Sequence, residues 1–340
     1  MLKIARIIAV LGVVTTLAGG CAGGSSGGPQ TSSLDAVNPF SPITSAKAVS
    51  GPRTWQVNVG AERRRQALQA LDFFPGSITI DVGDSITWTV EGNAHTVTFL
   101  GPLSTFPASD NPNLPFGGST YDGSALTSSG ALFPGKTYTL TFTKTGKYPY
   151  MCLFHPPEMV GVVTVQRAGT PYPHSQGFYS GQGLAEANDQ LAAAQASVRA
   201  FPYHDGGTTL TAGIAPGLAT GAPSFSTVLR FLDEDRLGPD GTSNTVTIPV
   251  GTTLTWVDQS NNEPHTVTFP PVGQGPPGGD PFMPGTGPLI GQTYDGTTLV
   301  NSGPLFPGQA FSLTFTKAGR FAYFCLIHDF IGMDGVVVVR

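Results

Sequence analysis

Two short segments of the chain carry side chains of the types that bind transition metals. They read Cys152-Leu-Phe-His155-Pro-Pro-Glu-Met159 and Cys325-Leu-Ile-His328-Asp-Phe-Ile-Gly-Met333. A second histidine precedes each cysteine by about 60 residues, His95 in the first case and His265 in the second. Thiolate, imidazole and thioether groups are soft or borderline ligands. The spacing therefore predicts two metal sites, each built from a distant histidine and a local loop.

Two imidazoles, one thiolate and a long axial thioether form the ligand set of a type 1 (blue) copper site. Cys, His and Met fall on one tight loop between the last two strands of each unit, and the upstream histidine projects from a neighbouring strand end. Cys152 and Cys325 are the only cysteines outside the N-terminal region, and each lies in its own repeat, so we expect no disulfide between them. The soft thiolate and thioether favour copper over zinc.

An internal repeat sets the architecture. The segment FPGKTYTLTFTKTGKYPYMCLFH, ending at His155, recurs as FPGQAFSLTFTKAGRFAYFCLIH, ending at His328. Upstream, YDG, HTVTF and an ITIDVGDSITW/VTIPVGTTLTW pair recur in the same order. Four ordered blocks indicate a duplicated domain of about 110 residues.

Apolar and polar residues alternate within each copy, which predicts strands with one buried face. We interpret ITIDVGDSITW as a hairpin turning at Val82-Gly83-Asp84. The predicted fold is all-β: two tandem Greek-key β-sandwiches, at 51–167 and 224–340.

The linker between the sandwiches, residues 168–223, contains one predicted amphipathic helix over 183–200. Its apolar positions at helical spacing are Leu184, Ala187, Leu191, Ala194 and Val198. We interpret this helix as a packing strut between the domains. The linker histidines His174 and His204 have no motif partners, so we expect surface or packing roles for them.

The N-terminus has the features of an export signal. Lys3 and Arg6 precede an apolar run, then small residues and Cys21. We predict a signal peptide over 1–20 and a flexible tether over 21–50, with Cys21 either lipidated as in bacterial lipoproteins or left by ordinary cleavage. This predicts an exported protein, periplasmic or at the cell surface, held to the membrane by a lipid anchor.

The pattern His…Cys-x2-His-x3/4-Met at the end of each repeat resembles the cupredoxin family, which includes plastocyanin, amicyanin, pseudoazurin and halocyanin. The resemblance covers nearly all of both repeats and implies two type 1 coppers per chain and electron transfer between redox partner proteins. The ligands that it implies are His95, Cys152, His155 and Met159, then His265, Cys325, His328 and Met333.

The chain departs from the family pattern in two respects. Many members have Asn after the upstream histidine, whereas this chain has Thr96 and Thr266, whose hydroxyls could donate a hydrogen bond in its place. The first ligand loop is also one residue shorter than the second, and Pro156-Pro157 stiffens it. We therefore expect the two sites to be unequal.

Two other functions share this fold or ligand set. A two-domain multicopper oxidase or nitrite reductase needs further histidines, commonly as His-x-His, and the sequence contains no such pair. A copper carrier or sensor without redox traffic usually has Met- or His-rich tracts, and this chain has only five methionines. We expect no enzymatic activity and no small-molecule substrate, and the net charge of −5 disfavours nucleic-acid binding.

Overall fold

The structure is a computed structural model. It describes residues 51–101, 117–155, 159–201, 207–215, 226–233, 245–260 and 263–340. The predicted signal peptide, Cys21, the tether, Pro156-Pro157 and His204 lie outside these residues. Within them, no helix is both long enough and apolar enough to cross a membrane.

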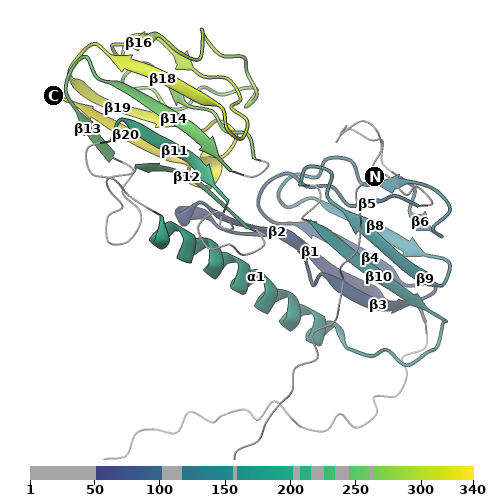
Figure 1. Ribbon diagram of the computed structural model, residues 1–340. Coiled ribbons are helices and arrows are strands. Elements are labelled where there is room, and N and C mark those ends of the chain that lie inside the picture. The colour runs from purple at the N-terminus through teal and green to yellow at the C-terminus, as the bar shows by residue number, and fades with distance from the viewer. Residues whose placement is uncertain are drawn as a thin grey trace, which may run out of the picture. The chain divides into compact units, whose positions relative to one another are not determined.

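The first repeat folds into a sandwich of two five-stranded layers (Figure 1). One layer has the order β2 (Leu68–Phe74), β1 (Thr54–Arg63), β4 (Ser85–Val90), β8 (Thr137–Phe142) and β6 (Thr120–Tyr121), with the short helix η1 (Arg64–Gln66) between β1 and β2. The other has the order β3 (Ser77–Asp81), β10 (Val160–Gln166), β9 (Gly146–Met151), β5 (Thr98–Phe99) and β7 (Thr127–Ser128). Strand β4 buries every second residue, so that Trp88 points into the core and packs against Tyr150 of the opposite layer at 5.5 Å between ring centroids.

The second repeat builds the same sandwich. One layer has the order β12 (Ser226–Asp233), β11 (Thr209–Ile214), β14 (Thr253–Gln259), β18 (Ala310–Phe315) and β16 (Gln292–Tyr294). The other has the order β13 (Thr245–Ile248), β20 (Asp334–Val339), β19 (Gly319–Phe324), β15 (Thr268–Phe269) and β17 (Val300–Asn301), with the short helix η2 (Asp329–Ile331) before β20. The ring centroids of Trp256 and Tyr323 lie 5.4 Å apart, which repeats the contact between Trp88 and Tyr150 in the first core. The prediction of two β-sandwiches is confirmed.

The predicted hairpin at Val82-Gly83-Asp84 is wrong. Strand β3 pairs with β10, whereas β4 pairs with β1 and β8, so the turn carries the chain from one layer to the other. The carboxylate of Asp84 holds this crossing, because it accepts hydrogen bonds from the backbone N–H of Asp81 at 3.0 Å and from the indole of Trp55 at 2.9 Å. Alternation marks a buried face in a hairpin and in a crossing alike, so it cannot tell them apart.

A short ladder between the repeats joins the two sandwiches. Strand β12 pairs with β2 in antiparallel register, with Ser226 opposite Ala70 and Val228 opposite Leu68. The two layers thereby merge into one ten-stranded sheet, in the order β16-β18-β14-β11-β12-β2-β1-β4-β8-β6. Equivalent strands of the two repeats meet at its centre (Figure 1), so the repeats are related by a pseudo-twofold axis, as in an isologous dimer.

The linker helix α1 (Gln176–Ala200) starts earlier than predicted, because Ser175 caps it by accepting a hydrogen bond from the N–H of Phe178 at 3.2 Å. Leu184 is exposed, contrary to the predicted face. Gly183 takes its place, since a Cβ there would come within 2.7 Å of the Phe74 backbone.

The other predicted apolar positions of α1 are buried in a cluster with side chains of both repeats. The cluster includes Ala187, Leu191, Ala194 and Val198 of the helix, Leu68 and Phe74 of β2, Ile214 of β11, and Val228 and Leu232 of β12. The helix therefore packs across the junction, as the strut interpretation predicts. Strand β11 lies within the predicted linker but pairs with β14, so the second sandwich reaches back before residue 224.

Asp72 on β2 gives a pH-dependent test of the helix–sheet contact. Burial raises its pKa from 3.8 to about 6, although Phe73 N–H and the Gln190 amide both donate to the carboxylate. The folded state thus binds this proton more tightly than the unfolded chain. The free energy of unfolding therefore falls as pH rises from about 4 to about 6, and above that range the ionised Asp72 lowers it by a constant amount. We expect Asp72→Asn to raise the free energy of unfolding by about 1 kcal/mol at pH 7.5 and to have little effect at pH 4.

Denaturant unfolding at the two pH values measures this difference. Asp189→Asn, at an exposed position of the same helix, is the control and should change neither value. An equal effect of Asp72→Asn at both pH values would contradict the raised pKa of Asp72.

Candidate metal centres

The two histidines and the cysteine of the first predicted ligand set come together at one end of the first sandwich. His95 is fixed by a two-residue bridge, in which its backbone N–H and C=O pair with Leu132 at 2.9 and 2.8 Å. Cys152 follows β9 directly, and His155 comes three residues later. The Sγ atom of Cys152 lies 3.7 Å from Nδ1 of His95 and 3.4 Å from Nδ1 of His155. Met159, before β10, is fully buried, and its C=O accepts from the N–H of Cys152 at 3.0 Å, which closes the loop.

The second set has the same arrangement. The Sγ atom of Cys325 lies 3.8 Å from Nδ1 of His265 and 3.5 Å from Nδ1 of His328, and the two Nδ1 atoms are 3.2 Å apart. Met333 is buried, and its C=O accepts from the N–H of Cys325 at 3.0 Å. The extra residue of this loop is taken up by η2, which ends at Gly332 in a left-handed conformation. Each site thus draws its histidines and cysteine from its own repeat.

A threonine ties each ligand loop to the upstream histidine. The backbone N–H of Thr96 donates to Sγ of Cys152 at 3.3 Å, and Thr266 does the same for Cys325 at 3.4 Å. The threonine hydroxyls accept hydrogen bonds from Leu153 N–H at 2.8 Å in the first site and from the leucine after Cys325 at 2.7 Å in the second. Each hydroxyl therefore accepts a hydrogen bond from its ligand loop, where we expected it to donate one.

The surroundings of both sulfurs favour the thiolate. Burial raises the pKa of Cys152, but the imidazoles of His155 and His95 outweigh burial and hold that pKa well below its usual range. His328 and His265 have the same effect on Cys325. Since the thiolate is the form that binds metals, both cysteines are prepared as ligands.

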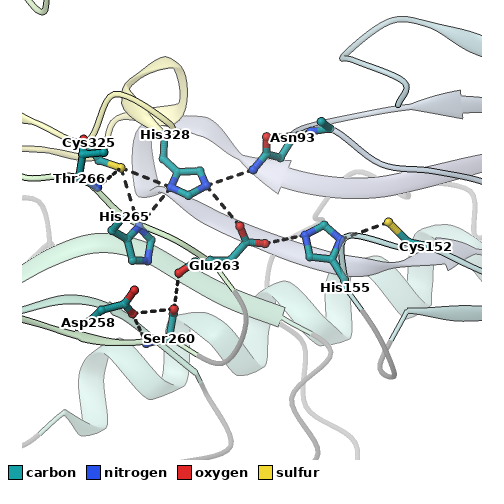
Figure 2. A network of polar contacts seen from close by, with 11 residues as sticks. Asn93, Cys152, His155, Asp258, Ser260, Glu263, His265, Thr266, Cys325 and His328 are labelled. Carbon is teal, nitrogen blue, oxygen red and sulfur yellow. Dashed lines mark hydrogen bonds and ion pairs between the residues drawn. The ribbon is translucent and has the colours of Figure 1, made fainter. Parts of the chain in front are cut away.

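A buried carboxylate lies between the two sites. Nε2 of His155 is 2.6 Å from Oε1 of Glu263, and Nε2 of His328 is 3.4 Å from Oε2 (Figure 2). Burial lowers the pKa of both histidines, but Glu263 and the two thiolates outweigh it and raise the pKa of His155 to about 10 and that of His328 to about 9. The histidines in turn outweigh burial at Glu263 and hold its pKa well below the usual range.

The residues fit a bound metal in both repeats. In each, one sulfur and two imidazole nitrogens lie within 4.8 Å of one another, and all three side chains are buried. A mixed thiolate and imidazole set with a buried methionine beside it suits copper. Among the residues that the structure describes, these two are the only such groups of His, Cys, Asp or Glu.

A family model for copper-binding proteins of the plastocyanin/azurin family matches residues 61–166 and 242–340. The chain belongs to this family. A relative is the chloroplastic plastocyanin of Tetradesmus obliquus, which is 37% identical over 100 residues; the match covers 28% of this chain and 60% of that protein.

Solved structures of amicyanin also resemble the chain. An oxidised mutant is 23% identical with a TM-score of 0.23, covering 33% of this chain and 82% of amicyanin. A reduced mutant at pH 4 is 23% identical with a TM-score of 0.24, and the match covers 38% of this chain and 92% of that amicyanin.

Several residues beside the ligands carry no signal in type or spacing. Gly60 and Gly213 lie at bulges of β1 and β11, with φ of 72° and 67°. They pack on the Nε2 atoms of His95 and His265, which have no hydrogen-bond partner among the described residues. These glycines lie outside the recognisable repeat blocks. The contact of Glu263 with both loop histidines could not be predicted from the sequence either. The linker histidine His174 is exposed and stacks on Phe178 at 3.8 Å, as expected of a packing residue.

Alanine at either glycine should disrupt one site. A Cβ on Gly60 would lie 2.6 Å from Nε2 of His95, and a Cβ on Gly213 would overlap His265. We expect Gly60→Ala and Gly213→Ala each to displace the imidazole and lower copper affinity at one site by at least tenfold, as measured by chelator competition.

Gly135→Ala and Gly308→Ala are matched controls, because these glycines have φ of 77° and 84° but open space around the Cβ. Alanine at either control position has the same strain from a left-handed backbone conformation, but its Cβ contacts no histidine. Copper affinities equal to those of the controls would refute the role of the bulge glycines.

Proposed function

We propose that the chain is an exported electron carrier that holds one type 1 copper in each of its two domains. The observation that carries the proposal is the pair of buried Cys/His/His clusters, repeated with nearly equal distances in a chain of a copper-binding family. His95, Cys152, His155 and Met159 would hold the first copper, and the equivalent residues of the second repeat the other. Bound copper would supply a one-electron Cu(I)/Cu(II) couple.

The protein's own contribution is a rigid and dry ligand cage. Cys152 and Cys325 are fully buried, and the backbone pairing of each cysteine with the loop methionine fixes the loop ends. Such a cage supports electron transfer with little rearrangement, and it disfavours ready release of the metal to a chelator, as a copper carrier would need. The match to the plastocyanin/azurin family supports a carrier rather than an enzyme, and the redox partners would be other proteins.

We expect two coppers per chain and an intense visible absorption from the thiolate-to-copper transition. Each ligand set is complete within its repeat, so Cys152→Ser should empty the first site and Cys325→Ser the second, each leaving about half the absorbance. Metal analysis and visible spectra of the variants measure this. One copper per chain, zinc in place of copper after copper-replete expression, or full bleaching by one substitution would contradict the proposal.

Lipidation of Cys21 would place the carrier at a membrane surface, with residues 22–50 as a tether. We expect the native protein to partition with membranes and Cys21→Ala to release or misprocess it without loss of colour. Mass spectrometry of the mature N-terminus and membrane fractionation measure this. A soluble native protein with an unmodified N-terminus would overturn the anchor and leave the copper sites in place.

A further inference from the structure

The junction of the two repeats brings the outer edges of two ligand histidines to one carboxylate. His155 and His328 turn their Nδ1 atoms toward the cysteines, so their Nε2 atoms face the neighbouring repeat. Glu263 occupies the space between them, with one oxygen toward each ring (Figure 2). The two sites are thus connected by two imidazoles and a single carboxylate.

Glu263 reaches this place by the pseudo-twofold symmetry of the chain. It lies two residues before His265, as Asn93 lies two residues before His95. Each crosses to the other repeat: the Asn93 amide nitrogen is 3.1 Å from Nε2 of His328, and Glu263 contacts His155. The second copy therefore places a charge where the first has a neutral amide.

The carboxylate is fixed and shielded from solvent. Glu263 is only 4% exposed, and its backbone C=O accepts a hydrogen bond from the Ser260 hydroxyl at 2.6 Å. Its ion pairs within the described part of the chain are those with the two histidines. A buried charge with such partners interacts strongly with any change of charge at either site, because little water screens it.

From this geometry we infer that Glu263 is a positioning residue shared by both metal centres, and that its carboxylate couples their reduction potentials. The inference rests on the proposed function. A ligand set with Cu(II) and one thiolate carries a net charge of +1, and uptake of one electron from a donor protein brings it to zero without breaking a bond. The single negative charge favours the oxidised form of both sites.

The two reduction potentials are coupled because both sites share the carboxylate of Glu263. While both sites are oxidised, two positive charges lie on either side of one carboxylate. Reduction of one site removes one of these charges, so the carboxylate pairs more fully with the other. The second electron should therefore enter at a lower potential than it would in a protein with an isolated site.

The test uses redox titrations of full-length single-site variants, Cys152→Ser and Cys325→Ser, with and without Glu263→Gln. We expect Glu263→Gln to raise the midpoint potential of both sites by about 59 mV. For one electron this equals about a tenfold change in the oxidised-to-reduced ratio at a fixed potential. In the two-copper protein we expect two separated one-electron steps that move closer together in Glu263→Asp, whose shorter side chain keeps the charge but cannot reach both rings.

Asp258→Asn is the matched control. Asp258 is buried near the end of strand β14 and accepts from the Ser260 hydroxyl at 2.7 Å, but its charge interacts with the second site, at His265 and Cys325. We expect it to leave the first midpoint unchanged. A Glu263→Gln variant that shifts one midpoint or neither would overturn the inference.

A second readout needs no copper. In the metal-free protein, ¹H–¹⁵N spectra of the histidine rings should show both His155 and His328 shifted by Glu263→Gln. A response of one ring alone would overturn the shared contact. Absence of copper from the unsubstituted protein would defeat the proposed function, whereas bound copper with unmoved midpoints would defeat only the coupling.

Discussion

The three-residue antiparallel ladder between β2 and β12 sets the relation between the two halves of the molecule. It joins equivalent strands, so it imposes a pseudo-twofold axis and a single sheet of ten strands. Helix α1 covers the junction with an apolar stripe that contacts both halves, and this packing stabilises the short ladder. Only with the repeats in this orientation can His155 and His328 approach a common side chain. The placement of one metal centre relative to the other thus depends on the few backbone hydrogen bonds of this ladder.

Within each half, the ligands are placed by backbone more than by side-chain choice. The upstream histidine is held by a bridge to Leu132 or Leu305, and its ring packs on a bulge glycine. The loop ligands are held by pairing of the cysteine backbone with the methionine backbone. A bulge bends one strand locally and leaves the rest of the sheet regular. The copper cage is therefore a property of the sandwich edge, and the same cage appears twice because the edge is duplicated.

The clustering of the two histidines and the cysteine in each repeat could be predicted because these residue types are scarce in this chain and recur in order. Glu263 could not be, since it is one of 22 acidic residues and its role comes from a partner in the other repeat. Alternation predicts the strands but not their partners, so it cannot distinguish a hairpin at Gly83 from a crossing between the two layers. The first turns of α1 carry few apolar residues, so the apolar spacing does not predict where the helix starts. Leu184 is exposed because Gly183 approaches β2 closely and occupies the buried face in its place. Strand β11 could not be predicted from the repeat because its sequence no longer resembles that of β1.

The exchange of Asn93 for Glu263 at equivalent positions has a consequence for how such a protein can arise. Two identical, separate domains meeting about the same axis would present either two amides or two carboxylates to the junction. Two carboxylates in one dry space would repel each other, and one would have to take up a proton. Covalent fusion removes this restriction, because each copy can then mutate alone. A single buried charge at the centre of a nearly symmetric pair is thus a feature open to a tandem gene product and closed to a homodimer.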